Sequence, residues 1–331
     1  MSYGKRNSLE KAVSKLLPGS FGTAFSYLAC RFQQQFAQYS VKVEIKQSSV
    51  KEGASMGELV YACMAPHGYE IIGEIAGPEW GKFAKTRLGM ERLGSEMQKA
   101  HPDVVIVVTP HGYRVERHIA VSTNAYVEGR LSKFDVEVAM RLESDVQLAN
   151  KVISNAQTSG LPVIEVCYGS AAGSFSVLPL DWGSFIPLWF MGANWEAPPQ
   201  VVIVTPSREV GLDNLVEFGA TVASTIATCD QRIAVIASAD QGHAHLKEGP
   251  QGYNPASREY DELVRQAVDR QKLHKLLELD AEFVDAAKPD SLWQIAVLEG
   301  IRQKIPMQGH VVSYEVPTYY GLMCASFQIE N

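Results

Sequence analysis

Short, uninterrupted apolar runs recur along the chain from residue 59 onward. The clearest of them are Leu59–Ala65, Val104–Val108, Val163–Val166, Val201–Val204 and Ile233–Ala237. Runs of about five apolar residues, rich in β-branched side chains and without polar alternation, are typical of strands that are covered on both faces. The pattern therefore predicts a set of buried strands.

The segments between these runs carry apolar residues at helical spacing. The predicted helices are Lys82–Lys99, Asp135–Thr158, Asn214–Thr228, Ser257–Leu279 and a late apolar helix that opens at Asp290. Strands that alternate with helices indicate a mainly parallel or mixed sheet with helices on both faces. The predicted fold class is therefore α/β, with three layers in a single domain over residues 56–331.

Residues 1–55 differ in character from the rest of the chain. Up to Tyr39 they contain five basic residues and one acid, and the only helix they predict is Leu9–Leu17. Positive charge with few acids can indicate a transit peptide. The pattern favours instead a loosely attached extension outside the core, or a start codon assigned too early, with Met56 as the working start. We place the domain boundary between residues 55 and 56.

Composition and charge exclude several classes of function. Of the 331 residues 46% are hydrophobic, and the formal net charge of −7 gives no general affinity for nucleic acid or anionic membranes. No apolar run has the length of a membrane span, and no glycine-rich nucleotide motif occurs. The five cysteines are scattered and never spaced C-x-x-C, which argues against disulfides and a structural zinc cluster and favours a reducing cytoplasm. Self-association into a homo-oligomer stays open.

Three of the predicted strands lead into a histidine. The first two runs are each followed by a P-H-G-Y string, which contains His67 or His111, and the last run leads into S-A-D-Q-G-H, which contains His243. In open α/β sheets, ligands bind outside the carboxyl ends of the strands. We therefore expect these imidazoles at one edge of the sheet, and the matched turns favour His67 and His111 as a pair of metal ligands.

A carboxylate would complete the two-histidine arrangement that holds non-haem iron and leaves positions open for substrate and oxygen. The candidates are Asp240, Glu282, Asp285, Asp290 and Glu315. Asp290 stands where a helix N-cap is expected. However, Ser291 and Gln294 form an S-x-x-Q capping box by themselves, which leaves Asp290 free for another role.

Taken together, the strings A-P-H-G-Y, T-P-H-G-Y, S-A-D-Q-G-H and G-P-Q-G-Y-N-P-A-S-R-E-Y-D resemble the class III extradiol ring-cleavage dioxygenases. This is the superfamily of the protocatechuate 4,5-dioxygenase catalytic subunit, and it includes Memo-type relatives. The resemblance covers residues 56–327 and implies His67 and His111 as metal ligands. It implies Asp290 as the third ligand, in place of the usual glutamate, with Glu315 as the alternative.

The resemblance also implies an activity: Fe(II)-dependent extradiol cleavage of a small catecholic or aminophenolic ring by O2, with zinc or manganese as alternative metals. His243 matches the acid/base residue, and histidine titrates near neutrality, as proton transfer requires. The predicted substrate contacts are His245, Tyr253 and Glu315. The alternative is a Memo-like metal-binding protein, or a zinc-dependent hydrolase without dioxygenase activity. A structural subunit without metal is a third, weaker interpretation.

Overall fold

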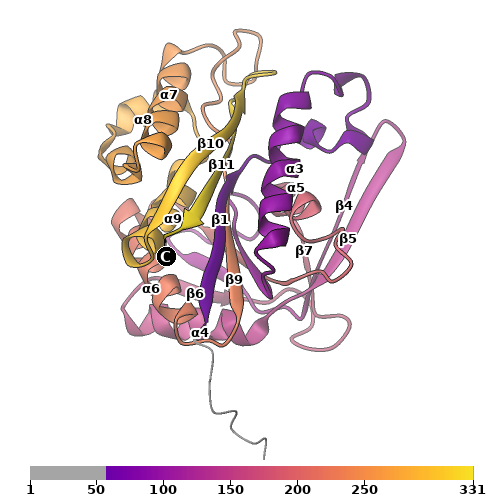
Figure 1. The fold of residues 1–331 in the computed structure, drawn as a ribbon, viewed down its shortest axis with the longest axis vertical. Helices are drawn as coiled ribbons and strands as arrows, with labels where there is room; N and C mark the ends of the chain where they lie inside the picture. The colour runs from indigo at the N-terminus through magenta and orange to yellow at the C-terminus, as the bar shows by residue number, and fades with distance from the viewer. Residues whose placement is uncertain (1–56, 331) are drawn as a thin grey trace, which may run out of the picture. The chain divides into compact units, whose positions relative to one another are not determined.

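The computed structural model describes residues 57–330. The predicted extension and the predicted helix Leu9–Leu17 lie outside the described residues. The main sheet has eight strands in the order β10-β11-β1-β9-β2-β8-β3-β6 (Figure 1). Its strands are β1 (Glu58–Ala65), β2 (Val104–Val108), β3 (Ile119–Ser122), β6 (Val163–Val166), β8 (Gln200–Pro206), β9 (Arg232–Ser238), β10 (Met307–Glu315) and β11 (Leu322–Ile329).

The centre of this sheet is parallel and its edges are mixed. β1, β9, β2 and β8 run parallel to one another, whereas β11 is antiparallel to β1 and to β10, and β3 is antiparallel to β8. The predicted strands and the mixed, mainly parallel sheet are therefore confirmed. Ala65 pairs with Ser238, and Val108 pairs with Ala237. As a result β1, β9 and β2 end at the same level.

Helices cover both faces of the sheet, as predicted. Successive side chains of a strand point to opposite faces, so Met64 and Ile106 belong to one apolar core while Cys63 and Val107 belong to the other. The first core contains α4, α6, α7 and α9, and the second contains α3, α5 and a small second sheet. The helices are α3 (Ala84–Lys99), α4 (Val146–Thr158), α5 (Trp182–Phe190), α6 (Leu212–Ile226), α7 (Pro255–Asp269), α8 (Ala281–Ala287) and α9 (Leu292–Lys304).

The predicted helix Asp135–Thr158 is wrong in its first half. This segment forms the hairpin of β4 (Tyr126–Lys133) and β5 (Val136–Glu143), which joins β7 (Val177–Pro179) in a three-stranded sheet. Both turn residues have positive φ, 52° at Phe134 and 61° at Asp135, as two-residue hairpin turns favour. Buried and exposed residues alternate from residue 137 to 143, which is the strand period of two. The helix starts only after Asp145, whose carboxylate accepts a hydrogen bond from the Leu148 N–H.

The predicted helix Ser257–Leu279 is divided. α7 ends at Asp269, and a 3₁₀ turn, η5 (Leu273–Glu278), follows. Gln271 between them has a φ of 59°, which a continuous helix cannot accommodate. The other 3₁₀ turns are η1 (Tyr69–Ile71), η2 (Gly73–Ile75), η3 (Gly77–Glu79) and η4 (Arg208–Val210).

Close contact between α6 and α9 determines where the N-terminus of α9 lies. A Cβ atom at Gly219 would collide with the Val297 carbonyl, and one at Gly300 would collide with the Val216 carbonyl. The two helices therefore pack with backbone against backbone, which side chains at these positions would prevent. This contact orients α9, so that Asp290, just before its first residue, lies beside His67 at the carboxyl end of β1.

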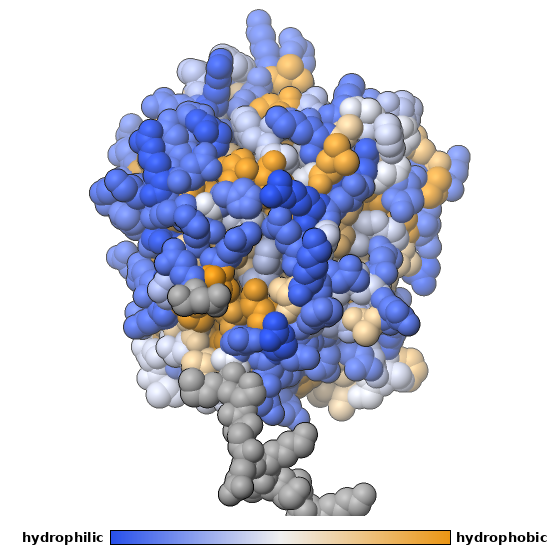
Figure 2. Space-filling view, viewed as in Figure 1, coloured by the Kyte–Doolittle hydropathy of each residue, from blue (hydrophilic) through white to orange (hydrophobic). Residues whose placement is uncertain are grey.

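The visible face of the molecule is mostly hydrophilic, with small apolar areas between polar side chains (Figure 2). Scattered exposed apolar residues are normal on protein surfaces. Among the helices of residues 57–330, none combines the length and the apolar character needed to cross a bilayer.

Candidate metal centre

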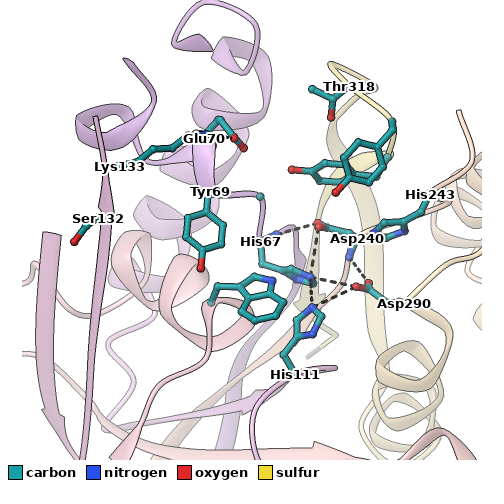
Figure 3. Close-up of a pocket in the computed structure, with 14 residues that line it drawn as sticks. His67, Tyr69, Glu70, His111, Ser132, Lys133, Asp240, His243, Asp290 and Thr318 are labelled. Atoms are coloured by element: carbon teal, nitrogen blue, oxygen red, sulfur yellow. Dashed lines mark hydrogen bonds and ion pairs between the residues drawn. The ribbon is translucent and has the colours of Figure 1, made fainter. Parts of the chain in front are cut away.

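Three side chains converge at the carboxyl ends of the central strands (Figure 3). His67 follows β1, His111 follows β2, and Asp290 lies just before α9. The Nε2 atoms of the two histidines are 3.2 Å apart, and Oδ2 of Asp290 lies 3.3 Å from His67 Nε2 and 3.6 Å from His111 Nε2. The structure thus brings together the three residues that the sequence predicted as metal ligands. All three ligand atoms lie within 4.8 Å of one another, which is close enough to share one ion.

Hydrogen bonds around His67 determine which ring nitrogen faces this cluster. The Ser238 hydroxyl donates to the Gly183 carbonyl at 2.5 Å, and the Ser238 oxygen lies 2.9 Å from His67 Nδ1. Because a hydroxyl has a single hydrogen, the serine must accept at the second contact, so Nδ1 of His67 carries a hydrogen. Nε2 then directs its lone pair at the cluster, as a metal-binding imidazole requires.

A second buried carboxylate, Asp240, borders the same cluster. Its Oδ1 accepts from the His67 backbone N–H at 2.9 Å, its Oδ2 lies 3.4 Å from His67 Nε2, and its own N–H donates to Asp290 Oδ1 at 2.9 Å. Within residues 57–330, neither carboxylate forms an ion pair with lysine or arginine. Lone pairs from two imidazoles and two carboxylates therefore face one another, and only a cation between them relieves the repulsion. This donor set fits a divalent metal.

In the absence of a metal, His67 itself supplies the positive charge, because its ring is protonated at both nitrogens. Burial disfavours the charged imidazole, but the carboxylates of Asp240 and Asp290 outweigh burial and raise the pKa of His67 to about 9. Burial raises the pKa of Asp240 to about 6. Burial and the charge on His67 lower the pKa of His111 to about 4. At neutral pH the histidine proton therefore occupies Nε2 of His67, where a metal ion would bind.

Asp290 and the alternative third ligand, Glu315, lie in different places. Oε1 of Glu315 accepts hydrogen bonds from the backbone N–H and the hydroxyl of Thr86, at 2.7 and 2.6 Å, near the start of α3. Asp290 makes no capping bond to α9, as predicted, but the expected capping box does not form either. Ser291 is the N-cap residue, yet its hydroxyl pairs with the Tyr260 hydroxyl at 2.8 Å.

His243 reaches the same cavity from the loop after β9 (Figure 3). Its Nδ1 lies 2.8 Å from the Gln241 carbonyl, and its ring stacks on Tyr320, with ring centroids 5.4 Å apart. A carbonyl can only accept, so Nδ1 donates and Nε2 is the basic nitrogen. His243 thus lines the cavity as the tautomer with its hydrogen on Nδ1, and its acid/base role stays a prediction.

The three residues predicted as substrate contacts do not line this cavity. Nε2 of His245 lies 2.9 Å from Oδ2 of Asp261, on the side of the loop that faces α7. Tyr253 is 63% exposed and borders a separate depression, and Glu315 binds Thr86. Their role as substrate contacts stays a prediction.

The cavity has a volume of about 580 Å³, and its far end is polar. Aromatic rings form the walls between the metal end and the polar end: Tyr69, Trp182, Tyr319 and Tyr320. Trp182 lies against His111, with ring centroids 4.1 Å apart. At the polar end Nζ of Lys133 lies 2.5 Å from Oε1 of Glu70, beside Ser132 (Figure 3).

Sequence reasoning missed Trp182, Glu70, Ser132 and Lys133. Glu70 directly follows the first P-H-G-Y string, so its nearness to His67 in the chain was the available signal. Lys133 precedes the turn of a hairpin, and the alternating pattern of β5 would have predicted that hairpin. Trp182 has no local signal, because it reaches His111 only through the packing of α5.

The fold and the centre define an α/β protein with a buried cluster of two histidines and a carboxylate at the carboxyl edge of its sheet. The family described as the catalytic LigB subunit of aromatic ring-opening dioxygenase matches residues 61–323. The chain belongs to this family.

Three similar proteins share 13–24% of their residues with this chain. A Clostridium acetobutylicum protein that carries only a locus name is 24% identical over 263 residues, which cover 78% of this chain and 56% of that protein. The match thus spans little more than half of that relative. The 2-aminophenol 1,6-dioxygenase beta subunit of a Pseudomonas species is 22% identical over 222 residues, covering 62% of this chain and 69% of the subunit. The crystal structure of an uncharacterized Escherichia coli K12 protein superposes with a TM-score of 0.50 at 13% identity, covering 81% of this chain and 99% of that one, a likeness of fold alone.

Proposed function

We propose that this chain is a non-haem iron dioxygenase that opens a small catecholic or aminophenolic ring next to its hydroxyl groups. The observation that carries the proposal is the convergence of His67 Nε2, His111 Nε2 and Asp290 Oδ2 at the end of an aromatic-lined cavity. Two imidazoles and one carboxylate hold Fe(II) and leave positions open for substrate and O2. Membership of the ring-opening family supports the reaction class, and the aminophenol dioxygenase relative supports the substrate class.

Each of the chain's own groups has a defined task in this proposal. Ferrous iron, when bound, supplies the redox chemistry by which O2 opens the ring. His67, His111 and Asp290 hold the ion, and Ser238 keeps His67 in the metal-binding tautomer. His243 accepts a proton from a ring hydroxyl at Nε2 and holds it for return to a ring carbon. The aromatic walls orient the ring and exclude water.

Metal analysis combined with oxygen consumption tests the proposal. The full chain is loaded anaerobically with Fe(II), Zn(II) or Mn(II), freed of excess metal and mixed with catechols and 2-aminophenol in air-saturated buffer. We expect about one iron per chain and O2 uptake equal to the amount of ring opened with the iron form. Stoichiometric iron without O2 uptake on any of these substrates would overturn the proposal.

One observation favours a Memo-like metal-binding protein as the second candidate, ahead of a zinc-dependent hydrolase, whose zinc keeps an open position. Asp240 adds a second carboxylate beside the three ligands, and four protein donors suit tetrahedral zinc better than an open iron site. This candidate predicts preferential retention of zinc and no O2 uptake in any metal form. The same loading experiment therefore separates the two candidates.

A further inference from the structure

The loop that carries His243 is held through its backbone. We name residues 240–245 the His243 loop. Each of its six consecutive backbone N–H groups donates to a partner outside the loop, at 2.7 to 3.1 Å. In chain order the acceptors are Asp290 Oδ1, the Gly321 carbonyl, Asp261 Oδ1, the Ala287 carbonyl, Ser257 Oγ and the Tyr319 carbonyl. Buried N–H groups require such partners, and here the partners come from three separate segments, 257–261, 287–290 and 319–321, which hold the loop from several sides.

Asp261, on α7, is the charged partner of this loop that lies outside the metal centre. Its carboxylate is 1% exposed and accepts three hydrogen bonds. Gly242 N–H donates to Oδ1 at 2.7 Å, while His245 Nε2 and the Tyr314 hydroxyl donate to Oδ2 at 2.9 and 2.7 Å. Burial and the charge of Asp261 raise the pKa of Tyr314, so its hydroxyl stays a donor. In the part of the chain that the structure describes, no lysine or arginine pairs with Asp261.

Gly242 and Gly321 allow close contact between the His243 loop, α7 and the segment before β11, because neither glycine has a side chain. A Cβ at Gly242 would lie 2.7 Å from the Cα of Ser257, and a Cβ at Gly321 would overlap Oδ2 of Asp261. The His243 loop, the start of α7 and the approach to β11 are therefore in direct contact. Asp261 lies at their junction, and it holds residues on both sides of His243.

We propose that Asp261 is a positioning residue for the proton-transfer step, which it serves by clamping the His243 loop through Gly242 and His245. The inference rests on the proposed function, because it assigns Asp261 to the histidine that transfers the proton. The clamp keeps Nε2 of His243 at the cavity, while the stack on Tyr320 and the bond to the Gln241 carbonyl set the ring orientation. His245 is then a member of the clamp and not a substrate contact.

The first test compares Asp261→Asn with Glu262→Gln. Asparagine keeps the shape of Asp261 but removes its charge and one acceptor. Glu262 is the next residue on α7, and its carboxylate is hydrogen-bonded to Arg265 and Gln266 on the surface. We expect kcat to fall roughly 10–100-fold in Asp261→Asn, as for other groups that orient a reacting residue. Metal content and KM stay at the wild-type level, and Glu262→Gln retains wild-type turnover.

The second test uses His245 and includes a rescue. His245→Ala removes one donor from Asp261, whereas His245→Gln can present an amide N–H at a similar reach. We expect kcat to fall in the alanine variant and to recover in the glutamine variant, with KM unchanged in both. A rise in KM with unchanged kcat in both variants would instead make His245 a substrate contact and overturn the clamp.

The third test does not depend on activity. In the zinc-loaded full chain, amide hydrogen exchange of residues 240–245 and the ¹⁵N signals of the His243 ring are measured. We expect roughly tenfold faster exchange across the loop and loss of the single Nδ1–H tautomer in Asp261→Asn, with neither change in Glu262→Gln. Wild-type protection of the loop in Asp261→Asn would overturn the proposal. If no substrate supports O2 uptake, the proposed function fails, yet this measurement still decides the clamp.

A failure of Asp261→Asn to fold would leave the inference testable. Tyr314→Phe removes one donor from Asp261 and no charge, so it perturbs the fold less. We expect loop exchange in Tyr314→Phe to lie between that of wild type and that of His245→Ala. Exchange at the wild-type rate in both of these variants would show that the carboxylate does not hold the loop.

Discussion

The two ends of the cavity are built in different ways. At the metal end, His67 and His111 follow central strands whose pairing with β9 is unbroken over residues 61–65 and 104–108. At the polar end, Glu70 comes from η1 and Lys133 from the end of β4, in the other sheet, and a single ion pair joins them. The side chains of His67 and Asp290 are only 2% and 8% exposed, whereas that of His111, at 25%, resembles the polar pair, at 20% and 33%.

This difference predicts different roles for the two ends, chemistry at the metal end and substrate preference at the polar end. Metal ligands placed by backbone pairing tolerate little change, so a substitution there should remove a whole step of the chemistry. A partly exposed ion pair is worth about 0–1 kcal/mol, so a substitution at the polar end should change substrate preference and little else. The predictions below test that contrast, from the largest expected effect to the smallest.

The largest effect is expected from the ligands themselves. His67→Ala and Asp290→Ala should each reduce bound metal from about one ion per chain to almost none, and turnover should disappear with the metal. Glu315→Gln is the matched control, because Glu315 binds Thr86 away from the centre, and it should retain metal. Elemental analysis of the purified variants measures this. Retention of metal by Asp290→Ala with loss from Glu315→Gln would reverse the assignment of the third ligand.

His243→Ala should separate proton transfer from metal binding. A positioned acid/base residue contributes typically ~10²–10⁴-fold in rate, so kcat should fall in that range while metal content stays at the wild-type level. Oxygen uptake and metal analysis on the same sample make the comparison. If the variant loses its metal as fully as His67→Ala does, His243 is a ligand and the acid/base assignment fails.

Metal affinity should rise with pH. The pKa of His67 is raised to about 9 without metal, so below that pH a metal ion must displace a proton from Nε2. The apparent affinity should therefore increase about tenfold per pH unit up to about pH 9 and then level off. The stability of the metal-free fold changes with pH in the opposite direction. The raised pKa of His67 stabilises the fold fully below about pH 6.5, the ordinary pKa of histidine, and this stabilisation is lost as pH rises through 9.

Chelator competition at several pH values measures this slope. Calorimetry in buffers of different ionisation enthalpy counts the proton released per metal ion. An affinity that does not change between about pH 7 and pH 8.5 would show that His67 does not carry that proton.

The smallest effect is expected at the polar end. Lys133→Met should leave metal content and stability unchanged and should alter kcat/KM by less than about tenfold, the scale of a partly exposed ion pair. The loss should be larger for a catechol with a ring carboxylate than for catechol itself, because the lysine cation is removed. Lys85→Met, an exposed lysine on α3, is the control. Loss of metal from Lys133→Met would contradict the claim that the polar end plays no part in metal binding.

Local sequence determined the strands and two of the three candidate ligands. A strand buried on both faces must be apolar throughout, and a residue just beyond its carboxyl end lies at one edge of the sheet wherever the helices pack. His67, His111 and His243 could therefore be placed without knowing the rest of the fold. The hairpin of β4 and β5 was missed because Val138 and Leu142 are four residues apart, a spacing that suits both a helix and a strand. Met140 between them is also buried, and this spacing of two residues fits only a strand.

Only the tertiary structure decided which carboxylate joins the histidines and which groups face the substrate cavity. Asp290 reaches the centre because α9 packs backbone to backbone on α6 at Gly219 and Gly300, and Glu315 is drawn instead to Thr86. His245 is hydrogen-bonded to the buried carboxylate of Asp261 and does not line the cavity. A strand end is a local property, encoded in adjacent residues. The direction of a loop side chain depends on partners more than ten residues away, for which the sequence offers no periodic signal.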